Sequence, residues 1–211
     1  MMFITLEGPD GSGKTTQVPA LAQAIRQAGF DLVVTREPGG TEIGDQVRQV
    51  IMDLKNKAMF PESEILLFQA SRAQLVREVI LPGLEAGRVV LCDRYADSTI
   101  AYQGYGHQTD LEHLRQIVEF ATGGLKPDLT VYLDIDPETG LKRRLGEGEE
   151  WNRLDDYELA FHQRVRQGYL KMMAAEPQRW VSIDADRPVD QVQAELQAVV
   201  LDRLQAKKGH D

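Results

Sequence analysis

One short segment near the beginning of the chain restricts the possible folds more than any other. Residues 8–15 read Gly-Pro-Asp-Gly-Ser-Gly-Lys-Thr, which is the pattern G-x-x-x-x-G-K-[ST]. They follow an apolar run at residues 3–7 and lead into a stretch of helical period that starts at Lys14. A strand, a glycine-rich turn and a helix in this order predict the first part of a βαβ unit, which requires a parallel sheet.

The rest of the chain continues this alternation of short apolar runs and longer stretches with the period of a helix. We expect strands at residues 3–7, 32–35, 88–93, 129–134 and 180–183. We expect helices at residues 14–28, 42–53, 62–81, 110–121, 137–145, 155–174 and 188–204, with a bend at Pro82 and Gly83. The pattern predicts an α/β protein with a three-layer P-loop NTPase fold, in which helices flank a mostly parallel five-stranded sheet. Because no linker or repeat divides the chain, we expect a single domain over residues 1–211.

Composition argues against several other classes of protein. With a net charge of −9 and a pI near 5.0, the chain is not expected to coat polymeric nucleic acid, because that binding depends on clustered Lys and Arg. No apolar run reaches the roughly 20 residues that a membrane-spanning helix needs. Met1 to Phe3 lead into the first apolar run without an export signal, and Cys92 has no second cysteine to pair with. We therefore expect a cytoplasmic protein without a structural metal.

The loop at residues 8–15 has the composition of a phosphate-binding site. Its small residues allow consecutive backbone N–H groups to point at phosphate oxygens, and the N-terminus of the following helix adds partial positive charge. Lys14 can reach the β- and γ-phosphates, and the Thr15 hydroxyl can bind Mg²⁺. Asp10 is unusual beside phosphates, so it either hydrogen-bonds a hydroxyl of a second ligand or shapes the turn through its own backbone. A glycine-rich turn without a ligand is the alternative for the whole segment.

A second candidate site follows the apolar run at residues 89–92, which ends in Asp93 and Arg94. The carboxyl ends of strands line the ligand crevice of open α/β sheets, so we expect Asp93 to face Lys14. Its carboxylate would hold Mg²⁺, partly through water, and Arg94 would bind an acceptor phosphate through two hydrogen bonds. The alternative is an ordinary Asp–Arg pair at the surface.

Four segments carry a resemblance to a known family. They are residues 6–16 (LEGPDGSGKTT), 35–41 (TREPGGT), 66–74 (LLFQASRAQ) and 93–104 (DRYADSTIAYQG). In this order and spacing they resemble the thymidylate kinase family, a branch of the P-loop nucleoside-monophosphate kinases, over nearly the whole chain. The resemblance implies an enzyme that uses ATP and Mg²⁺ to phosphorylate dTMP to dTDP for dTTP synthesis. It also implies a homodimer that associates through helices.

The resemblance further implies a role for each residue of the site. The residues implied in ATP binding are Gly8, Pro9, Asp10, Gly11, Ser12, Gly13, Lys14, Thr15, Thr16, Arg143 and Arg144. Those implied in acceptor binding are Asp10, Glu37, Arg48, Phe68, Arg72, Arg94, Ser98, Tyr102 and Gln103, with Arg36 near the acceptor phosphate. Phe68 would stack on thymine, Arg72 would donate to a thymine carbonyl, and Gln103 would read the base. Spacing alone leaves open a core role for Phe68 and a solvent-reaching role for Arg72.

Residues 143–153 predict a mobile lid, because they mix glycines, acids and three arginines without a clean period. The loop at residues 8–15 contains no arginine, so closure of this lid would supply the cation that stabilises the transferred phosphoryl group. By resemblance Arg153 best matches the catalytic lid arginine, and Arg143 or Arg144 would cover ATP. The alternative for each is a solvated loop charge. The catalytic set implied in this way is Lys14, Asp93, Arg94 and Arg153.

Two other functions remain open from the sequence. A deoxynucleoside kinase would share the loop and the Asp93–Tyr95 segment, but it would need a general base near the 5′-hydroxyl of its acceptor. A monophosphate acceptor is already an anion, so a kinase acting on dTMP needs no such base. A P-loop switch, whose nucleotide state is recognised by a partner protein, would hydrolyse slowly and need no small acceptor.

Overall fold

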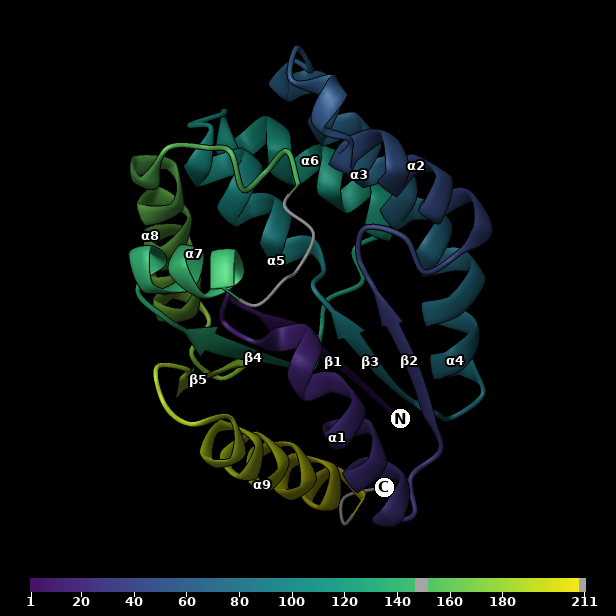
Figure 1. Ribbon diagram of the computed structural model, residues 1–211. Helices are drawn as coiled ribbons and strands as arrows, with labels where there is room; N and C mark the ends of the chain where they lie inside the picture. The colour runs from purple at the N-terminus through teal and green to yellow at the C-terminus, as the bar shows by residue number, and fades with distance from the viewer. Residues whose placement is uncertain (147–151, 209–211) are drawn as a thin grey trace.

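The computed structural model describes residues 1–146 and 152–208 (Figure 1). Five strands in this part of the chain form one sheet in the order β2-β3-β1-β4-β5. They are β1 (Met2–Glu7), β2 (Leu32–Arg36), β3 (Val89–Asp93), β4 (Leu129–Asp134) and β5 (Trp180–Asp184). All four pairings are parallel, so the predicted five-stranded sheet is confirmed and is parallel throughout.

Helices lie between consecutive strands, and one more follows the last strand. They are α1 (Lys14–Gln27), α2 (Glu42–Met52), α3 (Pro61–Leu75), α4 (Leu81–Glu85), α5 (Ala96–Thr99), α6 (Leu111–Thr122), α7 (Pro137–Gly146), α8 (Leu159–Ala175) and α9 (Val189–Lys208). A 3₁₀ turn, η1 (Leu54–Asn56), and two π-helical turns, η2 (Val76–Ile80) and η3 (Ile100–Gly106), complete the described elements. The predicted helix at residues 155–174 begins four residues later than expected, because the preceding residues form hydrogen-bonded turns around Asp155.

The predicted bend at Pro82 and Gly83 is wrong. The helical segment that begins with α3 continues through the π turn η2 into α4 and ends at Glu85. Pro82 lies in the first turn of α4, where a proline is tolerated, and the π turn before it changes the hydrogen-bond spacing. Gly83 allows the helix to approach the sheet closely, since a Cβ there would lie 3.1 Å from Cγ2 of Val90.

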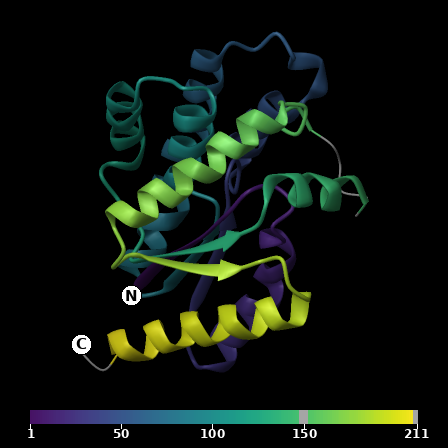
Figure 2. The same ribbon diagram turned by 90° about the vertical axis from the view of Figure 1, so that its left-hand side faces the viewer.

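The sheet is buried between two layers of helices, as Figures 1 and 2 show. Ile4 and Leu6 of β1 pack on the side covered by α1 and α9. Phe3 packs on the opposite side, where α3 and α4 lie. Helix α8 and η3 cover β4 and β5 on that second side through a cluster that includes Tyr132 and Tyr169. Burial of both faces explains why the strands read as continuous apolar runs.

The carboxyl ends of the strands bring the candidate site together. Leu6, just before the glycine-rich loop, pairs with Asp93 of β3, and Asp93 in turn pairs with Arg36 of β2. Three loops that are far apart in sequence therefore leave the sheet side by side. The strand order changes direction around β1, and ligands of open α/β sheets bind at such a point.

None of the helices in residues 1–146 and 152–208 combines the length and the apolar character that crossing a bilayer requires.

Candidate active site

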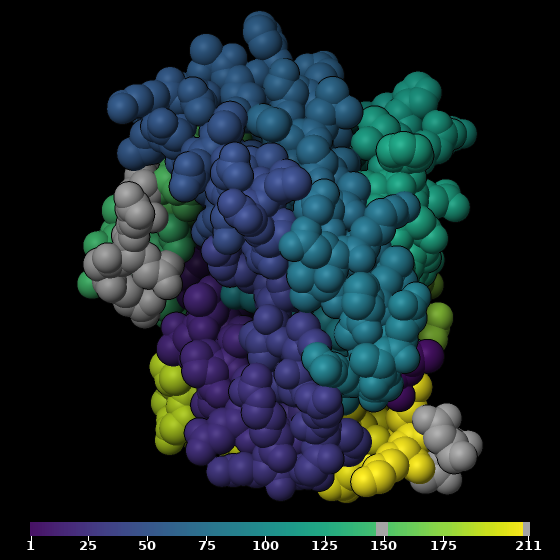
Figure 3. All heavy atoms as spheres, turned by 90° about the vertical axis from the view of Figure 1, so that its right-hand side faces the viewer, coloured from purple at the N-terminus to yellow at the C-terminus, as the bar shows by residue number. Residues whose placement is uncertain are grey.

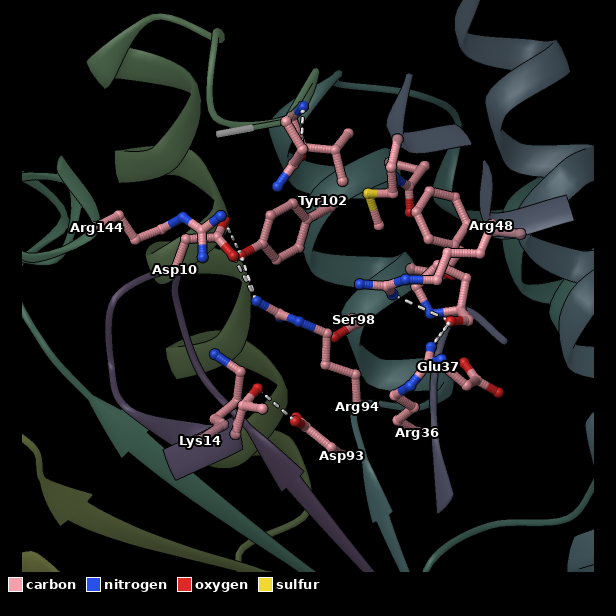
Figure 4. Close-up of a pocket in the computed structure, with 18 of the residues that line it drawn as sticks. Asp10, Lys14, Arg36, Glu37, Arg48, Asp93, Arg94, Ser98, Tyr102 and Arg144 are labelled. Atoms are coloured by element: carbon pink, nitrogen blue, oxygen red, sulfur yellow. Dashed lines mark hydrogen bonds and ion pairs between the residues drawn. The ribbon is translucent and has the colours of Figure 1, made fainter. Parts of the chain in front are cut away.

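A cavity of about 1020 Å³ lies at this edge of the sheet. Figure 4 shows side chains entering it from the glycine-rich loop, from the ends of β2 and β3, and from helices on both sides. The predicted site residues that line it are Asp10, Gly11, Gly13, Lys14, Thr15, Arg36, Glu37, Arg48, Phe68, Arg72, Asp93, Arg94, Ser98, Tyr102, Gln103 and Arg144. The predicted residues that do not line it are Gly8, Pro9, Ser12, Thr16, Arg143 and Arg153, and Thr16 is exposed in the first turn of α1.

The glycine-rich loop has the backbone geometry that its sequence predicts. Gly11 and Gly13 have φ angles of 74° and 82°, which a residue with a side chain adopts only with strain. The Nζ atom of Lys14 donates to the carbonyl oxygens of Gly8 and Pro9 at 2.9 and 2.7 Å. Burial, together with the nearby positive charge of Arg94, lowers the pKa of Lys14 to about 7. An anion in the loop would reverse this shift, so the buried ammonium favours a phosphate.

Thr15 and Asp93 meet beside Lys14. The Thr15 hydroxyl donates to Oδ2 of Asp93 at 2.8 Å, whereas Oδ1 is buried without a hydrogen-bond partner in the described structure. An unpartnered carboxylate oxygen next to a hydroxyl fits a hard cation such as Mg²⁺. The described residues hold no cluster of three or more His, Cys, Asp or Glu side chains suited to a metal. Mg²⁺ would therefore need phosphate and water oxygens as its remaining ligands, which is its usual environment beside nucleotides.

Asp10 is paired with the protein's own cation. Its Oδ1 accepts from Nη2 of Arg94 at 2.6 Å, and its Oδ2 accepts from the Tyr102 hydroxyl at 2.7 Å. Burial alone would raise the pKa of Asp10, but Arg94 and Lys14 lower it to about 2. The alternative in which Asp10 only shapes its own turn is wrong, because the carboxylate joins the loop to the opposite wall of the cavity.

Arg94 has a strained backbone conformation and lies between the glycine-rich loop and α5. Its φ angle of 66° is in the left-handed region, which is uncommon for a residue with a long side chain. This conformation lets Nη1 donate to the Gly8 carbonyl at 3.0 Å, and it lies 3.3 Å from the Ser98 hydroxyl. The Arg94 guanidinium therefore contacts the glycine-rich loop and α5 at once, as Figure 4 shows.

Arg72 and Glu37 form a buried ion pair. Arg72 is 1% exposed, and its Nε donates to both carboxylate oxygens of Glu37 at 2.9 and 3.1 Å. Its Nη1 donates to Gln69 Oε1 and to the Thr99 hydroxyl, both at 2.8 Å. The alternative in which Arg72 extends to solvent is wrong, because its charge is balanced inside the protein. Phe68, one turn earlier on α3, is half-buried and lines the cavity.

Further arginines approach the cavity near the end of β2. Nη1 of Arg36 and Nη1 of Arg48 both donate to the Pro38 carbonyl, at 3.0 and 3.1 Å. Burial lowers the pKa of Arg48, and the positive charges of Arg36 and Arg94 lower it further. Three guanidinium groups this close to one another favour binding of an anion between them.

The predicted lid is described only at its two ends, because residues 147–151 lie outside the described residues. Arg143 and Arg144 belong to the last turn of α7 rather than to a loop. Arg144 lines the cavity, and its Nη2 donates to Oδ2 of Asp155 at 2.8 Å. Arg143 points elsewhere and binds the Ala185 carbonyl at 2.8 Å in the loop after β5.

Arg153 is not brought together with Lys14 and Asp93. It is 4% exposed, and its Nη2 donates to Oε2 of Glu64 at 2.5 Å. Its Nε donates to the Ile51 carbonyl at 2.9 Å, so the guanidinium is held from two sides. The structure instead brings Arg144 to the cavity wall.

Two buried glutamates were not identified from the sequence. Glu7 accepts hydrogen bonds from the backbone N–H of Tyr95 at 2.8 Å and from the hydroxyls of Ser98 and Tyr169. Glu64 accepts from Gln103 and Arg153. A signal existed for each: Glu7 ends an apolar strand as Asp93 does, and Glu64 lies four residues before Phe68 on the same helix face.

Comparisons with known proteins agree with this geometry. Residues 6–196 match the family model of thymidylate kinase. A thymidylate kinase of Deinococcus radiodurans is 54% identical over 202 residues, which cover 96% of this chain and 97% of the relative. A thymidylate kinase of Roseiflexus sp. (strain RS-1) is 50% identical over 210 residues, which cover 94% of this chain and 93% of the relative. The crystal structure of thymidylate kinase from Ehrlichia chaffeensis matches with a TM-score of 0.77 and 34% sequence identity. The match covers 95% of this chain and 98% of the Ehrlichia chain.

Proposed function

Since the chain belongs to the thymidylate kinase family and phosphorylates dTMP, we propose that it takes the phosphoryl group from ATP with Mg²⁺, and that both substrates meet in the cavity around Arg94. The contacts of Arg94 support the assignment of a donor site and an acceptor site in this cavity. The Arg94 guanidinium contacts the Gly8 carbonyl of the loop on one side and the Ser98 and Tyr102 hydroxyls on the other. A cation in this position separates a donor half from an acceptor half of the same cavity.

The donor half is the glycine-rich loop with Lys14, Thr15 and Asp93. The backbone N–H groups of the loop hold the phosphates of ATP, and Lys14 exchanges its carbonyl partners for phosphate oxygens. When bound, Mg²⁺ would be held by Thr15 and Asp93, partly through water, and would neutralise charge on the donor phosphates. Arg143 reaches the loop after β5, which supports a role beside the adenosine part of ATP.

The acceptor half is the opposite wall. Arg36, Arg48 and Arg94 bind the 5′-phosphate of dTMP, which the convergence of their charges supports. Phe68, Arg72 and Gln103 contact the thymine ring, which is supported by the fact that all three line the cavity. The deoxyribose lies near Tyr102, where a 2′-hydroxyl would not fit.

The chemistry requires alignment and charge neutralisation rather than proton abstraction, because the acceptor oxygen of dTMP is already anionic. Lys14 contacts the proposed donor loop, and Arg94 contacts both that loop and Ser98 on the proposed acceptor side. We assign the additional cation from the lid to Arg144, because it lines the cavity. The earlier candidate, Arg153, is an alternative that mutation can test.

A coupled assay of ADP formation with dTMP, dUMP, dCMP, dGMP and thymidine tests this function. We expect ADP formation that depends on dTMP and requires Mg²⁺, with no turnover of thymidine. Turnover of thymidine alone would indicate a deoxynucleoside kinase, and tight ATP binding without turnover of any acceptor would indicate a nucleotide switch. Arg94→Lys provides a matched variant, because it keeps the positive charge but cannot bind a phosphate in the bidentate geometry of a guanidinium. It should raise the KM for dTMP roughly tenfold or more.

We further propose one domain over residues 1–211 and a cytoplasmic homodimer. All described strands join a single sheet, which supports one domain. Helices α2, α3 and α6 form one face of the molecule (Figure 3), and each carries an exposed apolar side chain, Ile43, Leu66 and Phe120 respectively. Such a face supports association with a second copy. The cytoplasm supplies both ATP and dTMP.

A further inference from the structure

The carboxylate of Glu64 connects two parts of the molecule. The side chain is 1% exposed, and each of its oxygens faces a different element. Oε1 accepts from Nε2 of Gln103 at 2.7 Å and lies 3.2 Å from Nε2 of His107, both in the region of η3. Oε2 accepts from Arg153 at 2.5 Å and from the Tyr157 hydroxyl at 3.2 Å, both in the segment before α8. Four partners from two segments fix the position of this group.

Glu64 is ionised throughout the working pH range. Burial would raise its pKa, but the hydrogen bond from His107 and the charge of Arg153 lower it to about 2. An ionised carboxylate only accepts hydrogen bonds. The amide of Gln103 must therefore turn its NH₂ group toward Glu64.

This orientation decides what Gln103 presents on its other side. Gln103 is 1% exposed and lines the cavity, so its amide has little room to rotate. Its Oε1 makes no hydrogen bond within residues 1–146 and 152–208. With the nitrogen bound to Glu64, the oxygen is the atom available to a ligand, and it is an acceptor.

Pyrimidine bases differ in whether their ring atom N3 donates or accepts a hydrogen bond. N3 of thymine and uracil carries a hydrogen and donates, whereas N3 of cytosine has no hydrogen and accepts. We propose that Glu64 is a positioning residue that fixes the polarity of the Gln103 amide, so that the site accepts a hydrogen bond from an imide N–H and rejects cytosine. The inference rests on the proposed role of Gln103 at the base. It assigns the choice of bases to a residue that does not line the cavity itself.

Glu64→Gln tests the proposal, because Arg153 only donates hydrogen bonds and would hold the new amide oxygen. The new NH₂ group would then face Gln103 and reverse the orientation of the Gln103 amide. The measurement is kcat/KM for dTMP, dUMP and dCMP. We expect the preference for dTMP over dCMP to fall by at least about tenfold, since a site built to hydrogen-bond a substrate N–H discriminates strongly against a base that lacks it. The ratio of dTMP to dUMP should stay unchanged, because both bases donate at N3. A purely structural role would change all three substrates alike.

Glu62→Gln is the matched control, because Glu62 is exposed on the same helix and its loss should leave both ratios at the wild-type value. A folded Glu64→Gln enzyme whose preference for dTMP over dCMP stays within twofold of wild type would overturn the proposal. Wild-type protein without dTMP-dependent ADP formation would instead refute the function itself, so the two failures are distinguishable.

A second variant covers the case in which Glu64→Gln does not fold. The exchange Glu64→Gln with Gln103→Glu places the amide on α3 and the carboxylate on η3. The new carboxylate accepts from the new amide and keeps an acceptor oxygen toward the base. We expect this double variant to retain the preference for dTMP over dCMP, and its loss in a folded double variant would contradict the proposed polarity.

Discussion

At the scale of single residues, the candidate site contains buried charged side chains that neutralise one another in pairs. Asp10 with Arg94 and Glu37 with Arg72 are ion pairs with little or no contact with water. Such pairs do not add much stability, but removal of one partner leaves the other charge buried and costs about 3–5 kcal/mol. Predictions for single residues must therefore separate lost chemistry from lost folding.

The first prediction concerns the buried lysine of the loop. Lys14→Ala should lower kcat by roughly a hundredfold or more, because a preorganised charge next to the phosphates is removed. The change should leave the fold intact, since the hydrogen bonds that Lys14 makes in the described part of the chain all go to carbonyl and hydroxyl groups of its own loop. Steady-state ADP formation measures the effect, with the exposed Lys126→Ala as control. Undiminished turnover would contradict the proposed donor site.

The second prediction separates the two candidate lid arginines. Arg144→Ala should lower kcat roughly a hundredfold, because Arg144 lines the cavity, and it should also lower the free energy of unfolding, because the buried Asp155 loses its cation. Arg153→Ala should lower the free energy of unfolding by about 3 kcal/mol, because Glu64 loses its buried cation, but it should leave kcat nearly unchanged. Turnover and denaturant unfolding of both variants provide the comparison. A larger loss of kcat in Arg153→Ala would return the catalytic role to Arg153.

The third prediction uses the pH dependence of Glu7. Burial and the charge of Asp97 raise the pKa of Glu7 from 4.5 to about 7, although Arg94 opposes the shift. A carboxyl whose pKa is raised on folding stabilises the fold most below its unfolded pKa, and this stability is lost as pH rises through about 7. Relative to Glu7→Gln, wild type should therefore lose roughly 5 °C of Tm between pH 5 and pH 8. Thermal melts that shift in parallel for the two proteins would show that Glu7 does not titrate in this range.

At the scale of elements, the glycine-rich loop packs directly against α7. A Cβ at Gly11 would lie 2.0 Å from the Gly140 carbonyl oxygen, and a Cβ at Gly140 would lie 2.3 Å from the Asp10 carbonyl oxygen. Two glycines thus allow the backbones to touch. Arg144 lies one helical turn beyond Gly140, so this contact fixes the distance between the loop and that guanidinium.

The fourth prediction tests that contact. Alanine in place of a helical glycine normally stabilises a helix by about 1 kcal/mol. Gly140→Ala should nevertheless lower kcat roughly tenfold, because the added methyl group pushes α7 away from the loop. Gly146→Ala is the matched control, since a Cβ at that end of α7 meets no atom beyond its chain neighbours and its own helix backbone within 4 Å among residues 1–146 and 152–208. Equal kcat values for the two variants would show that the close contact between α7 and the glycine-rich loop does not affect turnover.

At the scale of the whole molecule, one face carries exposed apolar side chains on three neighbouring helices. Helices α2, α3 and α6 lie together on the surface seen in Figure 3. Ile43, Leu66 and Phe120 on these helices are 54%, 59% and 85% exposed. Isolated apolar residues are common on surfaces, but three on adjacent helices favour an interface. Helix α3 also carries Phe68 and Arg72 into the cavity, so an interface there would lie next to the residues proposed to bind the base.

The fifth prediction follows from this face. Leu66→Glu should weaken self-association at least tenfold, because a charge would be buried at the centre of a symmetric contact. Size-exclusion chromatography with light scattering measures the mass over a range of concentrations. Val189→Glu, at an equally exposed apolar position on α9, should leave the mass unchanged. A wild-type monomer at high concentration would contradict the homodimer.

Much of the fold and part of the site are determined by residues that are neighbours in the sequence. The five strands were predictable because each is a short apolar run, and the phosphate loop because eight consecutive residues contain its geometry. Asp93 and Arg94 could be placed because strand ends of a parallel sheet share one edge. Phe68 and Arg72 follow helical spacing. These features depend on local conformation, which a single segment encodes.

Only the tertiary structure decided how the buried charges are paired. Arg153 is held by Glu64, which lies 89 residues away, and Glu7 is bound by Tyr169 across 162 residues. Spacing within a segment cannot show which of several acids an arginine will meet. The choice depends on the packing of α3, η3 and the segment before α8, where burial makes an unpaired charge too costly to persist. For the same reason Arg144, rather than Arg153, lines the cavity wall.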